Sequence, residues 1–195
     1  CLKIAYEQKS INKKIYQEKI KNLLSLSNLC KKTLLIDSKI QKTSKAFIEA
    51  KGSMFLGRGY SFPIALEGAL KLKELAYVHA EGYPAGEMKH GPLALIEEGM
   101  PVVVLAPRDE YYKKTVSNMQ EVIARGAKVL LVTNKSKNEV QSENIWETIE
   151  VENLSEDLLP FLTTIPLQKL AYYSALQKGY DIDKPRNLAK SVTVE

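Results

Sequence analysis

The sequence predicts an α/β fold in which a parallel sheet is covered by helices on both faces. Two continuous apolar runs, Pro101–Ala106 and Lys128–Thr133, have the pattern of strands that are buried on both faces. A segment of helical length and periodicity, Tyr111–Arg125, stands between them. Strands that alternate with helices of this size imply a parallel sheet.

The other elements are expected on both sides of this unit. Apolar residues recur at helical spacing from Ile11 to Leu24, and a second helical piece is expected over Leu29–Ala50. Gly52 is the first glycine and marks a boundary. The remaining predicted elements are a strand at Ser53–Leu56, a helix at Ile64–Val78 with Pro63 near its first turn, a Gly/Pro loop to Pro92, a weaker strand at Asn144–Val151 and a helix at Leu158–Gln177. Pro166 is expected to kink the last helix or to move its start.

The predicted organisation is a helical linker at residues 1–51, one sheet domain at 52–180 and a polar C-terminal tail at 181–195. The linker holds 12 Lys and Arg against 4 Asp and Glu, whereas the rest of the chain holds 16 against 19. Nucleic-acid binding by this basic linker is one interpretation. The lysines alternate with Ile and Leu, however, which favours the solvated face of an amphipathic helix.

The composition gives no sign of a membrane or secreted protein. No apolar run approaches the roughly 18 residues of a membrane span, and the N-terminus lacks a signal-peptide pattern. Cys1 and Cys30 are too few for a disulfide framework and have no metal-ligand spacing. We therefore expect a reducing, cytoplasmic location. The missing initiator Met leaves open whether the chain begins within a longer protein or is processed.

Three charged residues share one stripe of the otherwise apolar helix at Ile64–Val78. Glu67, Lys71 and Glu74 are four and then three positions apart. An exposed ladder of ion pairs explains this spacing and is favoured by spacing alone. The alternative is a buried carboxylate beside an ammonium, which can move a proton on and off carbon. Lys73 points to another face and is expected to be solvated.

The two histidines and one tail lysine are further candidates. His79 is expected to cap the carbonyl end of the helix. His90 lies in the segment Lys89–Pro92, where a surface histidine and a catalytic one are equally compatible with the sequence. Lys190 belongs to the tail, where disorder is the default expectation.

Loops that follow the predicted strands give no cofactor signature. Ligands of parallel sheets bind beyond the carboxyl ends of the strands, which brings Gly57–Ser61, Pro107–Glu110 and Thr133–Lys137 around one rim. Gly57-x-Gly59 does not complete a dinucleotide fingerprint, because the third glycine is absent. No Walker, zinc-ligand or GxSxG motif is present. Neither a cofactor nor a metal is predicted.

Three sequence blocks together closely resemble the C-terminal end of the glucosamine-6-phosphate synthase family. They are FLGRGYSFPIALEGALKLK at Phe55–Lys73, ELAYVHAEGYPAGEMKHGPLAL at Glu74–Leu95 and KPRNLAKSVTVE at Lys184–Glu195. The resemblance is strong over roughly residues 50–195 and rests on pattern alone before that. It implies the second of two sugar-isomerase (SIS) domains, a three-layer α/β fold, with the active-site tail and the preceding linker.

The resemblance also implies roles for individual residues. Glu74 is the base that moves a proton between C1 and C2 of the sugar, and Lys71 lies beside it in the substrate site. His90 opens the sugar ring, and the family takes this histidine from the neighbouring subunit of a homodimer. Lys190 forms a Schiff base with open-chain fructose 6-phosphate, and Ala189 contacts the substrate. No metal or redox cofactor is implied.

The sequence departs from the complete family in two ways. The SGET-type phosphate loop is absent, and Pro107–Glu110 lacks the hydroxyls that would replace it. The glutaminase domain is absent too, and the helical run after Cys1 does not fit that domain's nucleophile. We therefore expect an isomerase fragment that is inactive by itself. The alternatives are a non-catalytic module that binds a sugar phosphate, which would not need Glu74, His90 and Lys190 together, and the nucleic-acid-binding linker.

Overall fold

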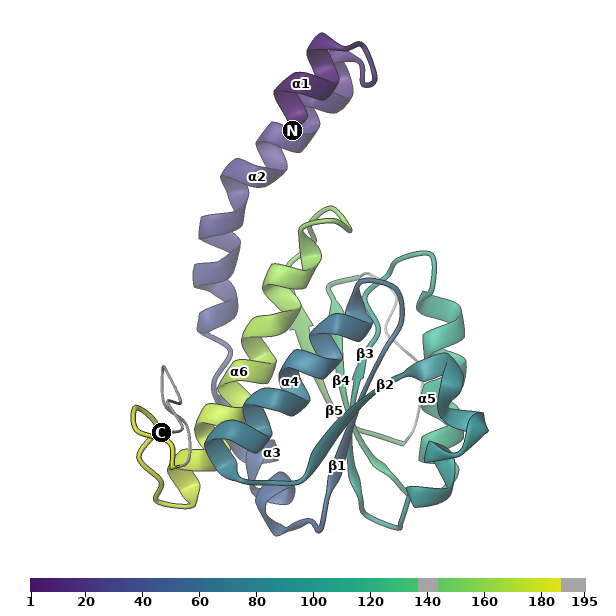
Figure 1. Cartoon of the computed structure of the whole chain (residues 1–195), viewed down its shortest axis with the longest axis vertical. Helices are drawn as coiled ribbons and strands as arrows, with labels where there is room; N and C mark the ends of the chain where they lie inside the picture. The colour runs from purple at the N-terminus through teal and green to yellow at the C-terminus, as the bar shows by residue number, and fades with distance from the viewer. Residues whose placement is uncertain (137–143, 187–195) are drawn as a thin grey trace, which may run out of the picture.

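A computed structural model describes residues 1–136 and 144–186 of the chain. Its five strands are β1 (Ser53–Gly57), β2 (Ala80–Pro84), β3 (Pro101–Leu105), β4 (Lys128–Asn134) and β5 (Ile145–Val151). Its helices are α1 (Leu2–Glu7), α2 (Lys13–Leu34), α3 (Ser38–Glu49), α4 (Ser61–Ala76), α5 (Tyr112–Ile123) and α6 (Leu159–Gln177), with the short 3-10 helices η1 (Ala85–His90) and η2 (Pro92–Leu95). The predicted α/β fold is confirmed (Figure 1).

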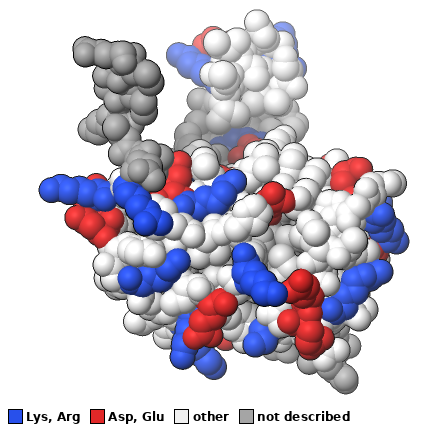
Figure 2. Space-filling view, turned by 60° about the horizontal axis from the view of Figure 1, so that its bottom comes forward, with Lys and Arg blue, Asp and Glu red and all other residues white. Residues whose placement is uncertain are grey.

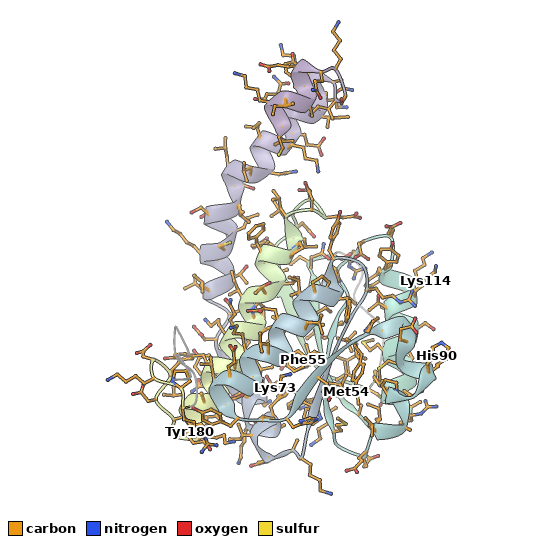
Figure 3. All side chains as sticks on the ribbon, viewed as in Figure 1. Met54, Phe55, Lys73, His90, Lys114 and Tyr180 are labelled. Atoms are coloured by element: carbon orange, nitrogen blue, oxygen red, sulfur yellow. The ribbon has the colours of Figure 1, made fainter. Side chains whose placement is uncertain are left out.

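All strand pairs are parallel, in the order β2-β1-β3-β4-β5. Every residue of β1 and β3 is buried, as the unbroken apolar run of β3 predicts. Side chains alternate between the two faces. Phe55 and Val103 pack with α3, α4 and α6 on one face, whereas Met54 and Val102 pack with α5 and η1 on the other. The sheet therefore separates α4 from η1 (Figure 3).

The N-terminal helices form an arm that leads into the sheet domain. In Figure 1 the upper part of α2 projects away from the sheet domain, and α1 folds back on its tip. The Asn12 side chain accepts a hydrogen bond from the N–H of Ile15 and so caps α2. Near the sheet domain, Lys19 is paired with Asp157 at 2.7 Å. The break between helices lies between Leu34 and Ser38, so the sequence-based start of a second piece at Leu29 is wrong.

One more expectation needs correction. The Gly/Pro segment after α4 is no simple loop, because residues 80–84 form the edge strand β2 and pair with β1. Most of this strand is half-buried and it contains a glycine and a proline, so its sequence does not have the pattern of a strand. Of the two expectations for Pro166, a moved start of α6 is excluded, because the helix begins at Leu159 and contains the buried proline.

Helices α4 and α6 pack closely because a glycine lies at their contact. A Cβ on Gly68 would lie 2.6 Å from Cδ1 of Leu167 and 3.0 Å from the ring of Phe55. The contact fixes α4 against both the sheet and α6. It thereby sets which face of α4 points outward with its charged stripe.

Candidate functional site

The charged stripe of α4 has the arrangement that its spacing predicts. Nζ of Lys71 donates a hydrogen bond of 2.6 Å to Oε2 of Glu74 and lies 3.7 Å from Oε1 of Glu67. The side chains of Lys71 and Glu74 are 30% and 27% exposed. They are neither a fully exposed ladder nor a buried pair, so both sequence-based interpretations were too extreme. Part of the surface of this half-buried pair therefore stays open to a ligand.

The pair is electrostatically asymmetric. The hydrogen bond to the Glu74 carboxylate raises the pKa of the Lys71 ammonium above its usual value, against a smaller opposing effect of burial. Lys71 is therefore a cation at any physiological pH. Its hydrogen bond fixes the position of the Glu74 carboxyl group, which can serve as a proton acceptor there. Lys73 is exposed on another face, as expected (Figure 3).

The stripe lies toward the end of α4 that is remote from the rim of strand ends. The strands are parallel, so the loops after β1, β3 and β4 do share one edge, and the backbone N–H of Arg108 joins two of them by donating to Asn134. Helix α4 begins at this edge with Ser61 and ends with Ala76 at the opposite one. The predicted rim therefore lies near the start of α4, whereas the predicted catalytic carboxylate, Glu74, lies near the end of the same helix.

The histidines do not join the Lys71–Glu74 pair. His90 ends η1, which packs beside α5 on the other face of the sheet. Its side chain is 74% exposed and its Nε2 lies 4.0 Å from Glu87. Figure 3 shows His90 far from Lys73 of α4, with Met54 and Phe55 of the sheet between them. Within one chain, the structure therefore brings together Lys71 and Glu74 but not His90.

The expectation that His79 caps α4 is wrong. Helix α4 ends three residues earlier, and Nζ of Lys178 from the end of α6 donates to the carbonyl of Ala76. His79 lies 3.5 Å from Glu81 instead and lines a cleft of about 340 Å³ with Lys51 and Glu97. Neither charge nor spacing in the sequence indicated that Lys178, a hundred residues away, would serve this helix end.

The C-terminal segment reaches α4 at its last described residues. The phenol oxygen of Tyr77 accepts a hydrogen bond of 2.6 Å from the backbone N–H of Arg186. The Arg186 guanidinium lies 4.1 Å from the centre of the Tyr77 ring, and Tyr180 packs against that ring at 4.9 Å. Ala189 and Lys190, predicted from the resemblance, lie outside the described residues. Tyr77, Tyr180 and Arg186 were missed, because no motif marks residues that meet only in the folded chain.

The face of the molecule in Figure 2 has no dominant basic patch, and the described residues form no evident metal site. Figure 2 shows Lys and Arg side chains interspersed with Asp and Glu on the face that includes the lower end of Figure 1. Within residues 1–136 and 144–186, no group of three or more His, Cys, Asp or Glu side chains converges to hold a metal ion. None of the helices described there is long and apolar enough to cross a bilayer.

Comparisons with known proteins agree with the architecture. The profile of the SIS domain matches residues 46–178. Curated relatives named glutamine–fructose-6-phosphate aminotransferase (isomerizing) are 46% identical in Bartonella quintana and 50% in Bacteroides thetaiotaomicron, each over the whole chain and 32% of the relative. The chain thus spans about a third of these relatives. A solved C-terminal domain of glucosamine-fructose-6-phosphate aminotransferase from Francisella tularensis superposes with a TM-score of 0.88 at 42% identity, over 94% of this chain and 51% of that one.

Proposed function

This chain belongs to the SIS domain family, and we propose that it is the C-terminal isomerase domain of an enzyme that makes glucosamine 6-phosphate from fructose 6-phosphate and glutamine. The half-buried pair of Lys71 and Glu74 carries the proposal, because it places a hydrogen-bonded carboxylate on an open helix face. The names of relatives that are 46% and 50% identical support the choice of reaction. We infer that the enzyme acts in the cytoplasm as a homodimer.

The proposed chemistry divides among three side chains. The amine of Lys190 adds to the C2 carbonyl of the open-chain ketose, and water leaves as the imine forms. Ammonia released from glutamine then replaces the lysine at C2, which frees the Lys190 amine and leaves the sugar as the imine of ammonia. The imine acidifies the C1 proton more than a carbonyl does. The Glu74 carboxylate takes this proton and returns it to C2, while the Lys71 ammonium holds the carboxylate in position by its hydrogen bond. His90 exchanges the proton of the ring oxygen when the sugar opens.

The position of His90 on the far side of the sheet agrees with a site shared between two subunits. Since the sheet separates η1 from α4, one chain does not present His90 to its own Glu74. A second copy that places its η1 near this α4 would complete the set. Phosphate recognition also needs groups beyond this chain, because the loop Pro107–Glu110 offers no hydroxyl cradle.

The test uses the full-length protein that contains this chain. Glu74→Gln keeps the size and hydrogen-bonding capacity of the side chain but removes the base. We expect isomerase turnover to fall by roughly 10²–10⁴-fold, with fructose 6-phosphate still bound. Glu67→Gln on the same stripe is the matched control and should retain most activity. Equal activity of Glu74→Gln and the unmodified protein would exclude Glu74 as the base.

The alternative is a non-catalytic module that binds a sugar phosphate. It shares the fold but needs no base, so Glu74→Gln and Lys190→Arg would leave binding unchanged and there would be no turnover to lose. Measuring binding and turnover on the same samples separates the two functions.

A further inference from the structure

His90 lies at the end of a helix that is too short to hold it in place alone. The 3-10 helix η1 has six residues, and the hydrogen bonds of such helices are poorer than those of an α-helix. The His90 side chain is 74% exposed, and its one ion pair within the described residues is to Glu87, at 4.0 Å from Nε2. His90 therefore has no strong contact of its own, and its position depends on what holds η1.

Two contacts fix the first part of η1. Met88 is 1% exposed and packs in the core on the α5 face of the sheet. The guanidinium of Arg58 lies against Gly86, where a Cβ would collide with it. These contacts hold Gly86 and Met88, but the two residues that follow, Lys89 and His90, are both exposed.

An ion pair ties the end of η1 to α5. Nζ of Lys89 lies 3.1 Å from Oε1 of Glu121, which is the one carboxylate of α5. The Glu121 side chain is 21% exposed, and its Oε2 is buried without a hydrogen-bond partner in the part of the chain that the structure describes. Its neighbour Val122 is buried in the same core as Met88. The carboxylate that holds Lys89 is thus carried by a helix that is itself fixed against η1.

Stability gives only a weak reason for this pair. Lys89 is 65% exposed, and ion pairs of such exposure contribute little to folding. A buried carboxylate oxygen without a partner costs stability rather than adding to it. The pair does, however, adjoin His90, whose Cα is about 3.8 Å from that of Lys89. On the other side of His90, Gly91 has φ +148° and ψ −55°, a conformation that suits only glycine, so the backbone itself sets the turn into η2.

We propose that Glu121 is a positioning residue: its ion pair with Lys89 holds the end of η1 on α5 and thereby sets the position from which His90 acts. The inference rests on the proposed function, because it takes His90 as the group that opens the sugar ring. Glu121 acts only through Lys89 in this role and does not touch the substrate. Proton exchange needs an imidazole nitrogen within hydrogen-bond reach of the ring oxygen, so a small displacement of η1 slows this step.

The decisive variant is Glu121→Gln in the full-length protein, tested on two sugars. Fructose 6-phosphate closes into a ring through O5, whereas 5-deoxyfructose 6-phosphate lacks this oxygen and stays open. Ring opening is therefore required for the first sugar and not for the second. We expect isomerase turnover of fructose 6-phosphate to fall about threefold to tenfold, the size of effect that an ion pair of this exposure can have. Turnover of the open sugar should stay at the level of the unmodified protein.

Matched variants separate positioning from stability. Lys89→Met removes the other partner of the pair and should give the same loss, confined to the cyclic sugar. Combining it with Glu121→Gln should add little, because both remove one contact. Lys114→Met is the control, since Lys114 is an exposed lysine of α5 with no ion pair among the described residues (Figure 3). It should turn over both sugars at the normal rate.

His90→Asn separates this inference from the function beneath it. If His90→Asn turns over both sugars normally, or loses both equally, then His90 does not open the ring, and its role in the proposed function is wrong. If it loses only the cyclic sugar while Glu121→Gln and Lys89→Met lose neither sugar, or lose both equally, the positioning role of Glu121 is wrong and the function stands. A loss confined to the cyclic sugar in all three variants supports the inference.

Discussion

The ammonium of Lys71 donates a hydrogen bond of 2.6 Å to the carboxylate of Glu74, one turn further along α4. Both side chains remain about 30% exposed, at 30% and 27%. The contact is thus strong enough to order the carboxylate and open enough to leave it accessible. The first prediction tests this relationship.

Lys71→Met should cost far more in activity than in stability. A half-exposed ion pair on a helix is worth up to about 1 kcal/mol, so the isolated chain should lose only a few degrees in its thermal midpoint. In the full-length protein, isomerase turnover should fall at least about tenfold, because the hydrogen bond that holds the Glu74 carboxylate in place is lost. Lys73→Met, on an exposed face of the same helix, is the control for both measurements. Unchanged turnover in Lys71→Met would show that the pair is merely structural.

Gly68→Ala should destabilise the chain by about 1–3 kcal/mol, because the new methyl group overpacks the contact between α4 and α6. The reason is the 2.6 Å approach to Leu167. Gly52→Ala is the control, since its Cβ would meet His79 only at an ordinary 3.6 Å. Urea unfolding followed by circular dichroism measures both. Equal midpoints for the two variants would contradict the close packing.

The hydroxyl of Tyr173 should contribute to the free energy of unfolding at neutral pH, and this contribution should be lost at high pH. Its hydroxyl donates to Asp37, and this hydrogen bond raises the tyrosine pKa to about 12. A group whose pKa is raised by folding stabilises fully below its unfolded value, near 10 for tyrosine, and loses this effect as the pH rises through the folded value. The difference in unfolding free energy between the unmodified chain and Tyr173→Phe should therefore be constant up to about pH 9 and shrink above pH 10. Tyr172→Phe, at a more exposed neighbour, is the control.

Glu74→Gln and His90→Ala should complement each other if the site is shared between subunits. Each full-length variant alone should be inactive. Random mixing by refolding makes half of the dimers mixed, and each mixed dimer has one intact site, so about a quarter of full activity should return. If no activity returns although mixed dimers are present, His90 acts within its own chain or not at all.

The isolated chain should bind fructose 6-phosphate weakly and show negligible synthase activity. It spans 32% of its curated relatives and has no phosphate cradle in Pro107–Glu110. Calorimetric titration with the sugar and an assay for glucosamine 6-phosphate measure this. Robust synthesis by the purified chain would contradict its assignment as a domain of a larger enzyme.

Most of the fold was predictable because its signals are local. The apolar runs of β3 and β4 and the helical stripe of α4 can be read from short windows of sequence, and their bounds differ from the structure by only a few residues. The edge strand β2 was not predictable, because Ala80–Pro84 is half-exposed and rich in turn-forming residues. Its extended shape comes from hydrogen bonds to β1, which no window of its own sequence contains.

The sequence by itself determined the fold class, the shared stripe of Glu67, Lys71 and Glu74, and the resemblance that nominates His90 and Lys190. Helical spacing decides which residues share a face, and this spacing is a local property. Only the tertiary structure decided that the sheet separates His90 from Glu74, that Lys178 caps α4 and that Tyr77 meets Arg186. The last two findings are contacts between residues about a hundred positions apart. They depend on how helices pack across a sheet, and the energy of that packing belongs to the assembled core rather than to any segment.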